Sequence, residues 1–134
     1  MEASYQLVLG FSAWTLFLLL LIGALRVGLV LTGHRKPNAF KPFGEDISPF
    51  ANRLCRAHAN CYENLPMVLG VILYAAWTNQ LAVTNCCAMI FLGARVLQSL
   101  THIISNSAKA VWLRFAFFVV QCSLLAYWMI CLWF

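Results

Sequence analysis

One polar segment decides how this chain must fold: Arg53-Leu54-Cys55-Arg56-Ala57-His58-Ala59-Asn60-Cys61-Tyr62-Glu63-Asn64-Leu65-Pro66. It holds two arginines, a histidine, two asparagines and a glutamate, although only 10% of all residues are charged. An apolar run from Leu65 to Trp77 follows it directly. A single helix is therefore expected to carry a polar first half and an apolar second half, so its surroundings must change along its length.

The composition around this segment is typical of a membrane protein. Of the 134 residues, 63% are hydrophobic, and the mean hydropathy is +0.80. A soluble domain has about a quarter of its residues charged, and one of this length could not bury so much apolar surface. The sequence therefore predicts an all-α integral membrane protein.

Neither the charge nor the cysteines indicate another class of protein. The net charge of +5 comes without a long basic run, so nucleic-acid binding is not expected. Cations beside apolar segments instead favour orientation in a bilayer with an anionic inner leaflet. The six cysteines form no CxxC pair and no spacing typical of metal ligands, so we expect neither a metal site nor a disulfide framework. The first apolar run is too long for a signal peptide and lacks a basic start.

Four stretches are apolar enough for membrane helices, each of which needs roughly 20 residues. Prolines 37, 42 and 49 exclude a long helix in the connection after the first stretch. Asp46 or Ser48 is expected to cap the second helix, with Pro49 in its first turn. We predict one domain over residues 1–134, a four-transmembrane-helix up-down bundle. Its expected spans are residues 7–31, 49–77, 81–102 and 110–134.

The basic residues predict the orientation of this bundle. They fall in or beside the first and third connections, whereas the turn at Asn79 and the last twenty residues hold no cation. The residues concerned are Arg35, Lys36, Lys41, Arg53, Arg56, Lys109 and Arg114. The positive-inside rule places both basic connections in the cytoplasm and both termini across the membrane.

The polar segment has a helical spacing that points to a ligand. Arg53, Arg56, Asn60 and Glu63 follow one another by 3, 4 and 3 residues, within a stripe about 80° wide on a helix. Two guanidiniums, an amide and a carboxylate can bind a zwitterionic, peptide-like anion. Alternatively, the stripe is an internal salt-bridged network between helices, because buried charges usually pair. The spacing leaves both interpretations open.

Polar residues of the other helices gather at the same basic end. Arg95, Gln98 and His102 share a face of the third stretch, which also fits ordinary polarity at a helix end. Arg114 is the only charge from Ala110 to Phe134. It either snorkels or, if it faces a pocket, could hold a substrate thiol as thiolate by lowering its pKa.

Two further residues are expected to be structural. Arg26 lies inside the first span, where a charge must snorkel or face the bundle interior. Pro66 removes one helical hydrogen bond and leaves the carbonyl of Tyr62 without its usual donor, which favours a kink above the stripe.

The pattern Arg56-Ala57-His58-x-Asn60-x-x-Glu63-x-x-Pro66, opening the second of four membrane helices, resembles the signature of the MAPEG family. These membrane-associated proteins in eicosanoid and glutathione metabolism include microsomal glutathione transferases and eicosanoid synthases. The resemblance implies a homotrimer of four-helix subunits that binds glutathione between neighbouring subunits, near the cytoplasmic face. It also implies roles for individual residues. Those matched to glutathione binding are Arg35, Arg53, Arg56, Asn60, Glu63, Gln98 and His102.

By the same resemblance, Arg114 matches the fourth-helix arginine that activates the thiol, and Arg95 matches a structural arginine of the third helix. Gln98 and His102 stand where family enzymes often have His or Tyr and Tyr. Phe115 and Phe118 follow Arg114 where a prostaglandin synthase-like member would have Ser and Tyr. These departures argue against prostaglandin isomerase activity.

The resemblance therefore implies a microsomal glutathione transferase-like detoxification enzyme. It would conjugate glutathione, as co-substrate, to hydrophobic electrophiles from the bilayer, with glutathione peroxidase activity on lipid hydroperoxides as a further activity. No metal is required. The alternative is a non-catalytic lipid-binding or scaffold member of the same fold. A channel fits less well, since no polar path crosses the upper half of the helices. The expected location is the bacterial inner membrane or the endoplasmic reticulum.

Overall fold

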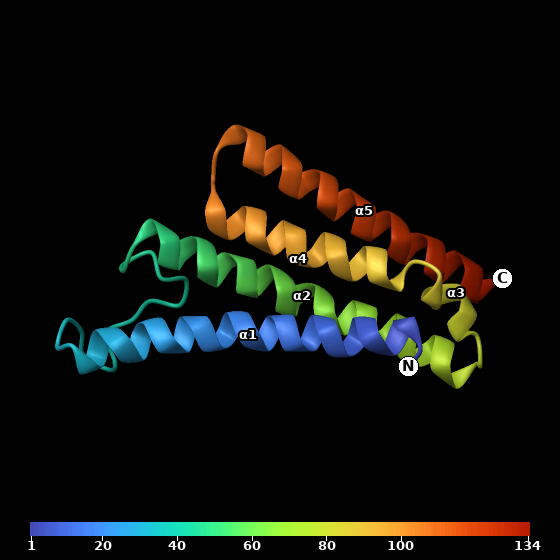
Figure 1. Cartoon of the computed structure of the whole chain (residues 1–134), viewed down its shortest axis with the longest axis horizontal. Coiled ribbons are helices and arrows are strands. Elements are labelled where there is room, and N and C mark those ends of the chain that lie inside the picture. The colour runs from blue at the N-terminus through green and yellow to red at the C-terminus, as the bar shows by residue number, and fades with distance from the viewer.

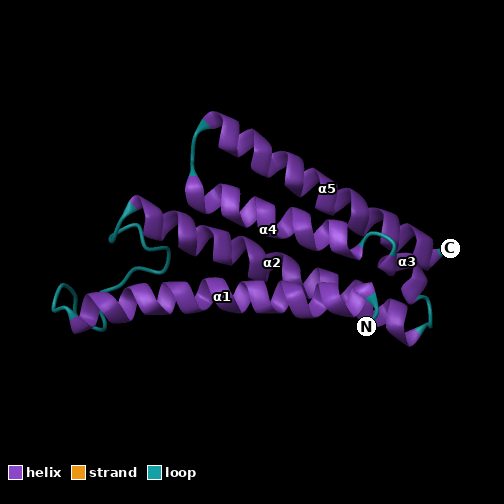
Figure 2. Cartoon of the chain, in the orientation of Figure 1, coloured by secondary structure: helices purple, strands orange, loops and turns teal.

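The computed structural model describes residues 1–134 and contains helices and loops but no strand. The helices are α1 (Ala3–Leu31), α2 (Pro49–Trp77), α3 (Leu81–Asn85), α4 (Ala88–Ile104) and α5 (Ala108–Trp133) (Figures 1 and 2). The four long helices alternate in direction, so both termini lie at one end of the molecule. The connections 32–48 and 105–107 lie at the other end. α1 and α5 are each long and apolar enough to cross a membrane.

The stretch at 81–102, expected as one helix, is interrupted. α3 ends at Asn85 and α4 begins at Ala88, with Cys86 and Cys87 between them. The side chain of Asn85 accepts hydrogen bonds from the backbone N–H and the hydroxyl of Ser4, and Thr84 bonds the same hydroxyl at 2.6 Å. Side chains such as Asn and Thr compete with helical backbone bonds. The start of α1 thereby stabilises the break, and α4, with 17 residues, is at the short end of the range for a bilayer crossing.

The core forms where α1, α2 and α4 meet. α5 packs mainly on α4 and makes no close backbone approach to α1. The Phe91 ring lies 6.4 Å from that of Phe11 and 5.6 Å from that of Trp128, joining α1, α4 and α5. α1 and α4 approach closely at Gly10, where an added Cβ would lie 2.7 Å from Leu92. Many apolar side chains on the outer faces of the helices remain exposed, as expected for a surface that faces lipid.

The start of α2 is set by local chemistry. The Ser48 hydroxyl accepts a hydrogen bond from the Ala51 N–H at 3.0 Å, and Pro49 occupies the first turn. Of the two caps that the sequence allowed, the structure uses Ser48, while Asp46 is bound to Arg35. Gly44 precedes them with φ +66°, and its backbone lies against Ala51, so the entry to α2 requires a glycine. α2 continues through Pro66 to Trp77.

Candidate functional site

Two adjoining cavities lie among α2, α4 and α5. The first, called here the polar cavity, measures about 420 Å³ and is lined by Phe43, Arg56, Ala59, Asn60, Glu63 and His102. The second, called the α5 cavity, measures about 230 Å³ and is lined by Asn60, Gln98, His102, Val111, Arg114, Phe115 and Phe118. Asn60 and His102 line both cavities, so the two cavities share a wall.

The charges of the α2 stripe do not neutralise one another. The ion pair between Arg35 and Asp46 is the only one in the structure. Arg56 and Glu63 both line the polar cavity, and both side chains are exposed. The alternative of an internal salt-bridged stripe therefore does not describe this chain. Arg56 and Glu63 present opposite charges to the same space.

Arg53 occupies a different position from its stripe neighbours. Its Nε donates a hydrogen bond to the carbonyl of Ile103 at 2.8 Å, in the last turn of α4. The last carbonyls of a helix lack intrahelical partners and carry negative partial charge, so an arginine satisfies them well. Arg53 lines neither cavity. Within one chain it joins α2 to α4 rather than reaching the cavity of Arg56.

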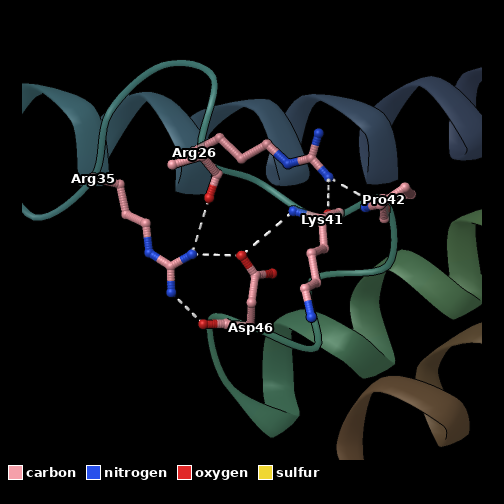
Figure 3. A network of polar contacts seen from close by, with 6 residues as sticks. Arg26, Arg35, Lys41, Pro42 and Asp46 are labelled. Carbon is pink, nitrogen blue, oxygen red and sulfur yellow. Dashed lines mark hydrogen bonds and ion pairs between the residues drawn. The ribbon is translucent and has the colours of Figure 1, made fainter.

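Arg35 is held within the connection before α2. Its Nη1 donates to the carbonyl of Ala39 at 3.1 Å and to the Asp46 carboxylate, and its Nη2 donates to the backbone carbonyl of Asp46 (Figure 3). Desolvation alone would raise the pKa of Asp46, but the hydrogen bond from Arg35 and the backbone bonds around it outweigh this and hold the pKa below its usual value. Within one chain, Arg35 does not line the polar cavity.

His102 and Arg114 each bring a nitrogen without a hydrogen-bond partner to the cavities. The Nδ1 atom of His102 and the Nε atom of Arg114 are buried without a hydrogen-bond partner. Arg114 does donate from Nη2 to the side-chain oxygen of Asn106 at 3.3 Å, just before α5. A buried polar atom left without a partner costs about 1–3 kcal/mol. A ligand acceptor would satisfy the Arg114 Nε–H, whereas His102 Nδ1 donates or accepts according to its tautomer.

Gln98 lines the α5 cavity but has a partner that the sequence reasoning missed. Its side-chain oxygen accepts a hydrogen bond from Nε2 of Gln121 at 2.9 Å, and the same nitrogen donates to the carbonyl of Phe117. Gln121 is buried and is the only side-chain amide within α5. The sequence signal that could have found this pair is a single side-chain amide in an apolar helix, since such amides hydrogen-bond between membrane helices.

Arg95 stabilises the site indirectly, through its contact with α2. Its side chain is 1% exposed, lies over the Phe11 ring at 5.3 Å, and donates from Nη1 to the carbonyl of Asn60 at 3.3 Å. It therefore holds the turn of α2 that carries Asn60. Arg26 lies elsewhere, beside the connection 32–48, where its Nη2 donates to the carbonyls of Lys41 and Pro42. No group of three or more His, Cys, Asp or Glu side chains is arranged to hold a metal ion.

These features define an all-helical protein of membrane type with a charged cavity at one end of its bundle. The sequence profile of the MAPEG family matches residues 6–134, and the chain belongs to that family. The family is membrane-associated and includes glutathione transferases and related proteins. Comparisons with curated proteins and with solved structures gave no match.

Proposed function

We propose that this protein is a membrane-bound glutathione transferase that conjugates glutathione to hydrophobic electrophiles. The observation that carries the proposal is the pair of adjoining cavities that share Asn60 and His102. One cavity offers Arg56 and Glu63, and the other offers Arg114 beside aromatic side chains. The polar cavity lies within the ~300–1,000 Å³ typical of small-molecule sites.

Each part of the tripeptide has a complementary group in this arrangement. Arg56 would bind a carboxylate of glutathione, and Glu63 would accept hydrogen bonds from its ammonium. Asn60 and His102, on the shared wall, would bind the peptide groups between the two ends. The thiol would then extend into the α5 cavity toward Arg114.

The chemistry follows from the charge of Arg114. An adjacent guanidinium favours the thiolate over the thiol, and the thiolate is the nucleophile. It attacks the electrophilic carbon, a carbon–sulfur bond forms, and the leaving group departs with its electron pair. Val111, Phe115 and Phe118 give the electrophile an apolar surface. With a lipid hydroperoxide, thiolate attack on the outer oxygen would release the alcohol, and a second glutathione would yield the disulfide and water.

The assembly belongs to the same proposal. We place all four long helices in the membrane, with the cavities near the cytoplasmic face and three copies of the chain in the complex. The exposed apolar side chains support the embedding. The exposed positions of Arg56 and Glu63 support a site that a neighbouring copy completes.

A glutathione titration of the purified protein, followed by ultraviolet thiolate absorbance, tests the proposal. Arg114→Ala should abolish the thiolate signal while weakening glutathione binding by less than about tenfold, because a neighbouring charge shifts a pKa by ~1–3 units. Lys109→Ala is the matched control, since Lys109 is an exposed cation at the start of α5 outside both cavities. An unchanged signal in Arg114→Ala would remove its assigned role. No binding by the wild-type protein would favour a lipid-binding or scaffold function.

A further inference from the structure

Arg26 carries a positive charge that nothing in the chain compensates. It is the only charged residue in α1, which is otherwise apolar or uncharged from Ala3 to Leu31. Its Nη2 donates to the carbonyls of Lys41 and Pro42 at 3.3 Å each, but its Nε is buried without a partner. No carboxylate forms an ion pair with it. A cation at this depth of a membrane helix is costly unless an anion or the interface satisfies it.

A cavity of about 450 Å³ lies directly beside this guanidinium. Arg26 and Asn38 supply its polar atoms, and its apolar lining includes Val27, Val30, Leu31 and Phe40. Leu31 is 82% exposed, so the apolar side of the cavity continues onto the outer surface of α1. None of its lining residues belongs to the polar cavity or to the α5 cavity. It is a separate site with a charged head and an apolar flank.

The connection 32–48 fixes the direction of the Arg26 side chain. Figure 3 shows Arg26 extending along the connection to Lys41 and Pro42, while Arg35 and Asp46 tie the same connection together. The Arg26 guanidinium also lies 5.6 Å from the centroid of the Phe40 ring. These contacts hold the planar fork in one place before any ligand arrives, which reduces the entropy lost on binding.

We infer that this cavity binds the headgroup of an anionic phospholipid. Nη1 of Arg26 has no partner within the chain and can donate to phosphate oxygens, and the Asn38 amide can donate to another. The acyl chains would lie along Val27, Val30 and Leu31. Lys36 and Lys41 are exposed in the same connection and add positive potential, which attracts the anionic lipids of an inner leaflet.

Native mass spectrometry of the full-length protein in detergent tests this site. The probes are phosphatidylglycerol and phosphatidylcholine with identical acyl chains, and inorganic phosphate in a separate arm. The wild-type protein should retain phosphatidylglycerol about fivefold more than phosphatidylcholine, the effect of roughly one basic residue near a lipid surface. Arg26→Gln should lose this preference. Lys109→Gln, which removes one exposed cation from the other basic connection, should keep it.

A second variant keeps the test decisive if Arg26→Gln does not fold. Asn38 lies exposed in the connection, so Asn38→Ala should fold normally and show a reduced preference. The inference is overturned if neither Arg26→Gln nor Asn38→Ala changes the preference, or if Lys109→Gln lowers it equally. Displacement of the lipid by equimolar inorganic phosphate would assign the site to a free anion. An oligomer without bound lipid that dissociates on Arg26→Gln would assign the groove to a second copy of the chain. Glutathione takes no part in these measurements.

Discussion

Arg56 and Glu63 differ from the other charged side chains in having no partner within the chain while lining one cavity. Arg35 donates hydrogen bonds to Asp46, and Arg53 donates one to a backbone carbonyl of α4. A charged side chain that already has a hydrogen-bond partner in its own chain gains less free energy on binding a ligand than one whose only partner is water. At the residue scale, we therefore propose that Arg56 and Glu63 recognise the two charged ends of a zwitterionic ligand.

Replacing Glu63 by Gln should weaken glutathione binding by about tenfold or more. The change removes the carboxylate that would accept the ammonium, and a hydrogen bond to a charged group contributes ~1.5–3 kcal/mol. Isothermal titration calorimetry would measure the loss. Glu45→Gln is the control, because Glu45 is an exposed acid in the connection and lines neither cavity. Equal affinities for Glu63→Gln and the wild-type protein would show that Glu63 does not contact the ammonium.

Helical spacing predicted that Arg56, Asn60 and Glu63 share a face, and all three lie with His102 around the polar cavity. Spacing within one helix is local, so it can be read from the sequence. The hydrogen-bond partners of Arg53 and Arg35 could not be predicted from the sequence. Ile103 lies fifty residues from Arg53, and the Arg35 contact depends on how a proline-containing connection folds. Contact with glutathione stays a prediction for every residue of the set.

At the scale of helices, features set by adjacent residues could be predicted, whereas features set by distant residues could not. The start of α2 could be predicted because Ser48 and Pro49 are adjacent to it. The break between α3 and α4 could not, because it depends on Ser4, eighty residues before Thr84. No proline or glycine marks residues 86 and 87. A break held by a distant segment has no signal in its own sequence.

The bond between Gln98 and Gln121 joins α4 to α5 inside an apolar interface. Gln121→Leu should lower the free energy of unfolding by about 1 kcal/mol, the scale of side-chain hydrogen bonds between membrane helices. Reversible unfolding in mixed detergent micelles would measure the change. Ser123→Ala, at an exposed position of α5, should leave stability within about 0.5 kcal/mol of the wild-type value. A stability of Gln121→Leu equal to that of Ser123→Ala would contradict the role of this bond.

The connection before α2 should respond to acid through Asp46. Because the pKa of Asp46 in the folded protein lies below the usual value for an aspartate, the ionised carboxylate stabilises the connection above that usual pKa. This stabilisation is lost as the pH falls through the folded pKa. Hydrogen exchange of residues 32–48, corrected for intrinsic rates, should show constant protection from pH 6 to about 4 and less protection below.

Asp46→Asn provides the comparison for that pH dependence. The amide cannot ionise, so its connection should exchange faster than the wild-type connection at pH 6 and show no step below pH 4. A step of equal size in Asp46→Asn would assign the titration to another group, such as the neighbouring Glu45.

At the scale of the whole molecule, charge is distributed along the bundle axis. The connections 32–48 and 105–107 lie at one end, with the basic residues in and beside them, and both termini lie at the other. The two cavities and the Arg26 site belong to the basic end. A water-soluble tripeptide and a lipid-soluble electrophile can meet only where the bilayer borders water. The arrangement supports a reaction at that boundary.

The same asymmetry predicts the orientation of the protein in its membrane. The positive-inside rule retains the basic end in the cytoplasm. Trypsin added to inside-out vesicles should therefore cleave the connection between Arg35 and Lys36, its one basic site not followed by proline, while an epitope tag placed after Phe134 stays protected. Right-side-out vesicles should give the reverse pattern, with the tag removed and the connection intact. Cleavage of both sites from the same face would mean that the long helices do not all cross the bilayer, and a cleaved tag in inside-out vesicles alone would invert the proposed topology and move the cavities to the opposite side.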